Sequence, residues 1–208
     1  MRPILWSFRR CPYAMRARLA LAAAGAQVEL REVILRDKPQ AFLETSPTAT
    51  VPCLDTGEEI IDESLDIMLW ALRNNDPERW LEMPPQGHDL IDENDGPFKT
   101  ALDRYKYASR HPEADSEAER GNASAFLMQL DGLLRGRAFL FGSRVSLADM
   151  AILPFVRQFA HVDLDWFSDQ PWPEARRWLE AFKSSQSFTA IMKKYPQWHP
   201  GAPGIAFP

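Results

Sequence analysis

The chain has 208 residues, of which 45% are hydrophobic and 25% charged, and its formal net charge at pH 7 is −5. A chain of this length forms one large domain or two small ones, and its composition is ordinary for a soluble globular protein. Its arginines are spread among acids, it has no run of about 18 apolar residues, and arginines interrupt the N-terminal apolar stretch. We therefore expect no nucleic-acid partner, no membrane span and no signal peptide, and a cytoplasmic location.

Cysteine and histidine usage also limits the chemistry. The two cysteines, Cys11 and Cys53, fit a reducing compartment better than a disulfide scaffold. Neither they nor the four histidines show the spacing of metal ligands, so we expect no metal site. Cys53 falls within a short apolar run and is expected to be a buried strand residue.

The first predicted unit places a cysteine at the start of a helix. Residues 3–7 form an apolar run typical of a strand, residues 8–10 turn the chain, and residues 12–24 have helical periodicity. Cys11 then falls at the helix N-cap, because Pro12 suits the first helical position. Backbone N–H groups and the positive end of the helix dipole favour a thiolate there, as do nearby arginines. The pattern therefore predicts a lowered pKa for Cys11.

The neighbourhood of Cys11 limits what its thiol can do. A redox pair requires Cys-x-x-Cys, but the second cysteine position is Ala14. A single thiolate can still attack a disulfide and hold the product as a mixed disulfide, which an external thiol then releases. This chemistry requires a bound thiol cosubstrate.

The following elements complete a β-α-β-α-β-β-α order. Gly25 ends the helix, residues 28–35 form a second strand parallel to the first, and residues 38–45 form a short helix. A third strand covers residues 51–54, where we nominate Val51–Pro52 as a cis peptide bond. After a turn and a strand at 59–61, a helix runs to about residue 75, capped by Asp62 or Ser64.

The second half is expected to be helical. Residues 76–88 contain three prolines and indicate a linker, followed by helical segments at 89–110, 116–135, 172–184 and 187–195. Ser146 and Asp149 have the spacing of a capping box, so we assign them a structural role at a further helix start. The Pro- and Gly-rich end after Pro196 is expected to be a tail.

Across nearly the whole chain, this order of elements and motifs resembles the cytosolic glutathione transferase superfamily. The motifs are Cys11-Pro12-Tyr13-Ala14, Val51-Pro52, Glu63-Ser64 and Ser146-x-x-Asp149. Cysteine at the active position, in place of tyrosine or serine, resembles the omega-type and related bacterial branches. The resemblance implies an α/β plus all-α fold: a thioredoxin-like glutathione-binding domain at 1–75, a linker at 76–88, and an all-helical domain at 89–208 that contributes the substrate pocket.

The same resemblance implies glutathione as cosubstrate, Cys11 as the catalytic residue, and a homodimer. Val51, positioned by a cis Pro52, would pair its backbone with the cysteinyl part of glutathione. Glu63 and Ser64 would hold the γ-glutamyl end at a helix N-terminus, although plain helix capping also explains them. Further glutathione-binding positions are Leu35, Lys38, which would reach the glycyl carboxylate, and Tyr13. Because the omega motif has phenylalanine there, it stays open whether Tyr13 only packs or brings a hydroxyl to the sulfur.

The function implied is a thiol transferase or reductase, in which Cys11 attacks glutathionylated or disulfide substrates. The second substrate would be a small hydrophobic molecule or a disulfide. Conjugating transferases, glutathione-dependent dehalogenases or isomerases, and non-catalytic partner-binding proteins share the fold and are the alternatives. The intact Cys11 argues against the last of these. Tyr105, Tyr107 and Trp166 either line the substrate pocket or belong to the core of the helical domain.

Overall fold

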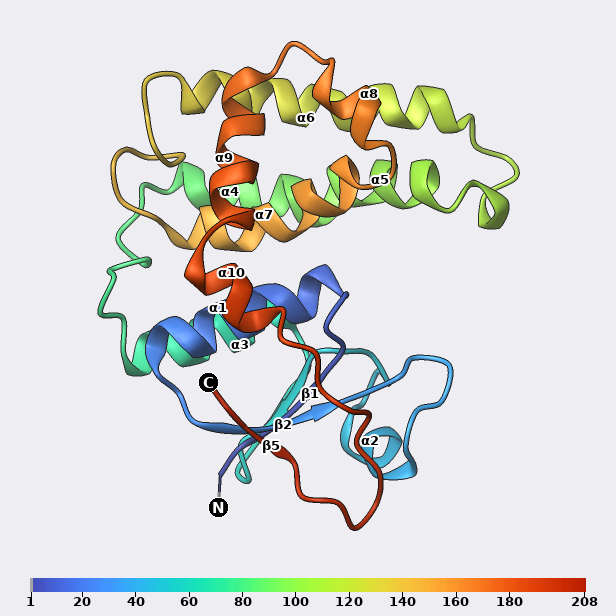
Figure 1. Ribbon diagram of the computed structural model, residues 1–208, viewed down its shortest axis with the longest axis vertical. Helices are drawn as coiled ribbons and strands as arrows, with labels where there is room; N and C mark the ends of the chain where they lie inside the picture. The colour runs from blue at the N-terminus through green and yellow to red at the C-terminus, as the bar shows by residue number, and fades with distance from the viewer. Residues whose placement is uncertain (1) are drawn as a thin grey trace. The chain divides into compact units, whose positions relative to one another are not determined.

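A computed structural model describes residues 2–208 and divides them into two compact units (Figure 1). The first contains the residues up to Arg79 together with Ser184–Pro208, and the second contains Trp80–Lys183. The expected helical domain at 89–208 is therefore wrong at its C-terminal end, because the chain returns to the first unit after Lys183. No helix in residues 2–208 combines the length and apolar character needed to cross a membrane.

The first unit is built on a five-stranded sheet with the order β4-β3-β1-β2-β5. The strands are β1 (Ile4–Ser7), β2 (Val28–Glu32), β3 (Cys53–Asp55), β4 (Ile60–Ile61) and β5 (Ile205–Phe207). The expected parallel pairing of β1 with β2 is confirmed, with Leu5 opposite Leu30, and the other pairs are antiparallel.

Four helices belong to this unit: α1 (Pro12–Ala24), α2 (Gln40–Thr45), α3 (Ser64–Asn74) and α10 (Gln186–Ile191). The crossover helix α1 has the predicted bounds, and it ends at Gly25, whose φ of 65° suits a residue without a side chain. It packs against α3 and α10. Figure 1 shows these three helices together over the sheet, with α2 apart from them.

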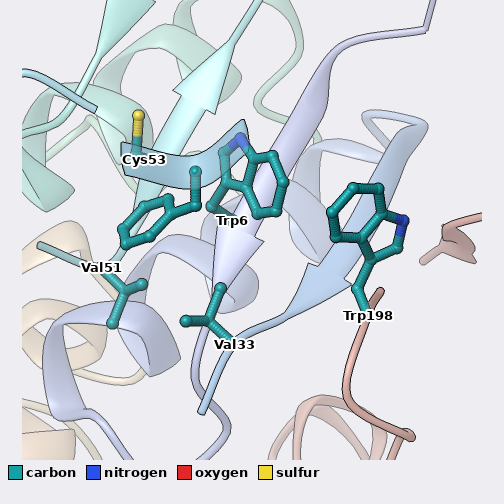
Figure 2. Packing of buried hydrophobic residues seen from close by; sticks show 6 residues of the cluster. Trp6, Val33, Val51, Cys53 and Trp198 are labelled. Carbon is teal, nitrogen blue, oxygen red and sulfur yellow. The ribbon is translucent and has the colours of Figure 1, made fainter. Parts of the chain in front are cut away.

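A cluster of buried side chains joins the sheet to the C-terminal segment (Figure 2). Trp6 of β1 contacts Phe42 of α2, with ring centroids 5.5 Å apart, and Trp198, with centroids 5.1 Å apart and planes at 89°. Val33, Val51 and Cys53 complete the cluster. Burying these large rings against one another fixes the C-terminal segment to the sheet.

The end of the chain differs from the sequence-based expectation. The helix expected at 187–195 ends at Ile191, and the expected tail contains β5, which pairs antiparallel with β2 and places Phe207 opposite Val28. The strand was missed because three residues among prolines and glycines show no periodicity, and its pairing partner lies far away in the sequence.

The second unit is helical, as expected. It contains α4 (Gln86–Glu93), α5 (Lys99–Lys106), α6 (Ser116–Leu134), α7 (Leu147–Ala160), α8 (Leu164–Ser168) and α9 (Pro173–Lys183). A π-helical turn at Asn94–Phe98 joins α4 to α5 and contains Pro97, which cannot donate a helical hydrogen bond. The predicted segment at 89–110 is thus nearly continuous, and it closes with a 3₁₀ turn at Ala108–Arg110.

The capping box at the start of α7 is confirmed. The Ser146 hydroxyl accepts from the Asp149 backbone, and the Asp149 carboxylate accepts from the backbone N–H of Ser146. The buried carboxylate also accepts from the Leu140 N–H at 2.9 Å and the Trp178 indole at 3.1 Å. Burial raises the pKa of Asp149, and these donors oppose the shift. The pair is structural and connects three segments of the second unit.

Candidate functional site

Cys11 lies where the sequence places it, between β1 and α1. It is the N-cap residue of α1, with extended backbone angles, and its side chain makes no capping hydrogen bond. Its backbone N–H donates to the Phe8 carbonyl at 3.0 Å, and its carbonyl accepts from Met15 at 2.9 Å. The half-buried Sγ atom is therefore held at the positive end of a 13-residue helix. Such a position favours negative charge on sulfur.

The second feature at Cys11 is the segment before β3. The Val51–Pro52 peptide bond is cis, as nominated from the sequence. The Cys11 thiol donates to the Val51 carbonyl, with Sγ and oxygen 3.6 Å apart. Two residues that are 40 positions apart in the chain thus meet at one point, next to the start of a helix. The structure therefore brings together Cys11, Val51 and Pro52, which the sequence analysis assigned to one site.

The arginines that lie near Cys11 in the sequence each make a contact of their own in the structure. The Arg10 guanidinium lies 5.3 Å from the centre of the Phe8 ring, and Arg9 donates to the Met192 carbonyl at 3.4 Å. Arg16 is buried, with its Nε donating to the Ser64 hydroxyl at 2.9 Å. The guanidinium of Arg16 therefore connects α1 with the start of α3.

A buried ion pair between Arg18 and Glu32 supports the turn before Cys11, and sequence reasoning missed it. Glu32 accepts the Arg9 backbone N–H at 2.7 Å through one oxygen and pairs with Arg18 through the other. Arg18 also donates to the Ser7 hydroxyl at 2.8 Å and the Ile191 carbonyl at 3.1 Å. Burial lowers the pKa of Arg18, and the Glu32 charge opposes this shift. In β2, side chains alternate between the two faces, and Glu32 lies on the buried face with Val28 and Leu30. An acid at a buried position needs a partner, and this was the sequence signal that could have indicated the ion pair.

The start of α3 differs slightly from the prediction. Glu63 is the N-cap and Ser64 the first helical residue, so neither Asp62 nor Ser64 caps the helix. Glu63 is exposed and borders a hollow of about 520 Å³ along α3 and β4, whereas the Ser64 hydroxyl is buried and bonded to Arg16. The backbone donors of the helix start and the Glu63 carboxylate can therefore meet a ligand, but the Ser64 side chain serves the packing.

The other residues predicted to bind glutathione belong to the first unit but lie at different places in it. Leu35 has 45% of its surface exposed and borders a second hollow, of about 750 Å³. Lys38 is half-buried just before α2. Tyr13 is half-buried on α1, with the Arg16 guanidinium 5.3 Å from its ring centre. Among residues 2–208, Cys11 itself lines neither of the two hollows.

The side chains considered for a substrate pocket in the second unit include two that pack in an aromatic cluster. Tyr105 and Trp166 both pack against Phe159, with ring centroids 5.7 Å and 6.0 Å from it. These contacts favour the core interpretation for both residues. Tyr107 instead packs beside cations, with the Arg110 guanidinium 4.7 Å from its ring centre.

Cys53 has the environment of an inert thiol. It is fully buried in β3, and burial raises its pKa from 9.0 to about 11, opposed by a hydrogen bond with Ser46. It is therefore protonated at neutral pH. In the described part of the chain, no three His, Cys, Asp or Glu side chains group closely enough to hold a metal ion.

Comparison with known sequences identifies the two parts of the chain. Residues 5–80 match the family model of the glutathione S-transferase N-terminal domain, and residues 113–181 match that of the C-terminal domain. Glutathione S-transferase omega-1 of Sus scrofa is 22% identical over 203 residues, which cover 90% of this chain and 79% of the relative. Glutathione S-transferase DHAR2 of Arabidopsis thaliana is 23% identical over 189 residues, covering 86% and 82%.

Solved structures share the fold. Glutathione transferase Omega 3C from Trametes versicolor superposes with a TM-score of 0.77 at 18% identity, covering 95% of this chain and 91% of that one. A glutathione transferase family member from Pseudomonas fluorescens pf-5, with two glutathione bound, gives a TM-score of 0.76 at 20% identity, and the match covers 92% of each chain.

Proposed function

Because the chain belongs to the glutathione S-transferase family, we propose that it is a glutathione-dependent thiol transferase in which Cys11 is the catalytic residue. The observation that carries this proposal is the position of Cys11 at the N-cap of α1, beside the cis Val51–Pro52 bond. A thiolate at a helix N-terminus is stabilised, and a stabilised thiolate is both a nucleophile and a good leaving group. The similarity to cysteine-type relatives of omega and DHAR type supports the same chemistry.

The proposed reaction has two exchange steps. The Cys11 thiolate attacks the glutathionyl sulfur of a mixed disulfide, GS–SR, forming Cys11–S–SG while the S–S bond breaks. The electron pair of that bond leaves with RS⁻, which takes a proton from water. A glutathione thiolate then attacks the glutathionyl sulfur on Cys11, so that GSSG forms and the Cys11 thiolate returns. In the net reaction GS–SR and one glutathione give GSSG and RSH: the sulfur of the added glutathione is oxidised to a disulfide, the R sulfur is reduced to a thiol, and the enzyme is unchanged.

The glutathione-binding site is proposed around the same thiol. The Val51 backbone would pair with the cysteinyl part of glutathione, with Pro52 fixing the direction of the chain. The exposed Glu63 carboxylate would meet the γ-glutamyl ammonium, while backbone N–H groups at the start of α3 would meet its carboxylate. Further contacts are proposed for Tyr13, Leu35, Lys38 and, through its backbone, Ser64.

Three further properties belong to the same proposal. The protein would act as a homodimer, by analogy with the family. It would work in the cytoplasm, where both cysteines stay reduced. Its second substrate would be a small disulfide or hydrophobic molecule, bound beside Cys11.

The test is glutathione-dependent reduction of the mixed disulfide between glutathione and 2-mercaptoethanol. We expect activity in the wild type and in Cys53→Ala, and none above the uncatalysed rate in Cys11→Ser. Cys53→Ala is the matched control, because it removes the other thiol and keeps a small apolar side chain. If Cys11→Ser keeps wild-type activity, or if the wild type is inactive while still binding glutathione, the proposal is wrong.

A further inference from the structure

A hollow of about 750 Å³ lies in the first unit, next to the turn that ends at Cys11. Three segments form its wall: residues 8–10 before Cys11, residues 32–36 after β2, and residues 194–197 of the C-terminal segment. All of them belong to the first unit. Its volume is in the range of small-molecule sites in proteins.

The wall of this hollow is strongly cationic. It carries Arg9, Arg10, Arg36 and Lys194, in a chain whose net charge is −5. Arg36 and Lys194 are exposed, and no carboxylate of the described part of the chain forms an ion pair with either. Their charges are therefore available to a ligand.

Glu32 is the only acid on the wall among the described residues, and its charge is already used inside the protein. One carboxylate oxygen accepts the Arg9 backbone N–H at 2.7 Å, and the other pairs with the buried Arg18. Since Arg18 balances Glu32 from within, the surface presented by the hollow stays cationic.

The wall also offers apolar surface. Leu35 is 45% exposed, and Phe8 and Tyr195 are half-buried. An exposed leucine beside aromatic side chains and cations suits a ligand that combines an apolar body with a negative group.

The hollow lies next to the turn that holds Cys11, although Cys11 itself does not line it. Phe8 and Arg10 belong to that turn, and the Cys11 N–H donates to the Phe8 carbonyl at 3.0 Å. A group attached to a sulfur bound at Cys11 would reach the hollow by extending past this turn.

We propose that this hollow binds the RS part of the mixed disulfide GS–SR and selects partners that carry an anionic group. This inference rests on the proposed function, because it concerns the second substrate of the same reaction. When Cys11 attacks the glutathionyl sulfur, RS⁻ departs from the hollow with the bonding electron pair and takes a proton from water. The cations hold its anionic group before the exchange.

The test compares three mixed disulfides of glutathione that differ in charge: those with 2-mercaptoethanesulfonate, 2-mercaptoethanol and cysteamine. In the double variant Arg36→Glu/Lys194→Glu, we expect kcat/KM for the anionic disulfide to fall by about five- to tenfold relative to wild type. For the neutral disulfide we expect a change of less than about twofold, and for the cationic one an increase. Comparing each variant with wild type on the same disulfide cancels the different leaving-group reactivities.

The matched control is Arg2→Glu/Arg135→Glu, which changes the net charge equally at exposed sites outside the hollow. We expect it to treat the three disulfides like wild type. Equal losses on all three in the first variant, or the same charge preference in the control, would overturn the assignment of the hollow. If wild type reduces none of the three with glutathione, the proposed function fails and this inference with it.

Discussion

At the scale of single residues, the two cysteines have opposite environments. Cys11 is half-buried at a helix N-terminus, and Cys53 is fully buried in a strand. The positive end of the α1 dipole favours a thiolate at Cys11, whereas burial raises the pKa of Cys53 to about 11. We therefore expect a reactive thiol at Cys11 and an inert one at Cys53.

This contrast predicts selective alkylation. Alkylation by iodoacetamide requires the thiolate. Between about pH 6 and 8, which is below the pKa of an ordinary thiol, the reagent should therefore modify Cys11 and leave Cys53 unmodified. Peptide mass spectrometry measures both sites, and unfolding in guanidinium provides the control in which both react. Equal labelling in the folded protein would contradict the assignment.

The proposed role of Glu63 leads to a second residue-scale prediction. Its carboxylate is exposed at the start of α3, so Glu63→Gln should remove an attraction to the glutathione ammonium while leaving the fold intact. We expect KM for glutathione to rise about three- to tenfold with kcat nearly unchanged. Glu58→Gln, in the exposed turn before β4, is the matched control. A loss confined to kcat would place Glu63 outside the binding site.

At the scale of elements, sequence patterns predicted most of the strands and helices from local signals, but they missed the short helix α8 and extended β2 to residue 35, beyond its end at Glu32. Pro12 and Gly25 mark the two ends of α1, and Ser146 with Asp149 marks the start of α7. The partners in contacts between distant segments could not be predicted in this way: the Arg16–Ser64 hydrogen bond and the Arg18–Glu32 ion pair join residues whose spacing shows no pattern. The buried-face position of Glu32 in β2 indicates only that this acid needs a partner. The position of Cys11 was therefore predictable, but the buried network that fixes its turn was not.

The capping box at the start of α7 should contribute measurably to the stability of the protein. Ser146→Ala removes the hydroxyl that accepts from the backbone of α7, and should lower the free energy of unfolding by about 1 kcal/mol. Ser146→Thr should recover part of this loss, because threonine also caps. Denaturant unfolding measures it, with Ser143→Ala in the preceding exposed loop as control. If Ser146→Ala and Ser143→Ala are equally stable, the cap contributes nothing.

At the scale of the whole molecule, the first unit is discontinuous in sequence. Its sheet is completed by β5, and its core includes Trp198, whose backbone N–H donates to the Glu32 carbonyl at 2.9 Å. The proline and glycine content of residues 197–208 is typical of a tail. Such composition does not show that a short strand within it pairs with β2. The C-terminal residues therefore belong to the scaffold of the Cys11 site.

Removing residues 184–208 tests this organisation. The deletion exposes Trp6, frees the edge of β2 and removes the Ile191 carbonyl from Arg18, so the first unit should lose stability while the second keeps its own core. Hydrogen exchange should show faster exchange in α1 and β2 and unchanged protection in α6 and α7. Trp198→Ala is the milder variant and should show the same pattern to a smaller degree. Uniform loss of protection across both units would contradict it.

The most direct test of the central claim is to trap the intermediate on Cys11. The protein is mixed with a glutathione mixed disulfide in the absence of free glutathione, quenched in acid, and mapped by mass spectrometry. We predict one glutathionyl group on Cys11 and none on Cys53, removed when glutathione is then added. A wild-type protein that turns over the disulfide with glutathione but never carries glutathione on Cys11 would contradict the account.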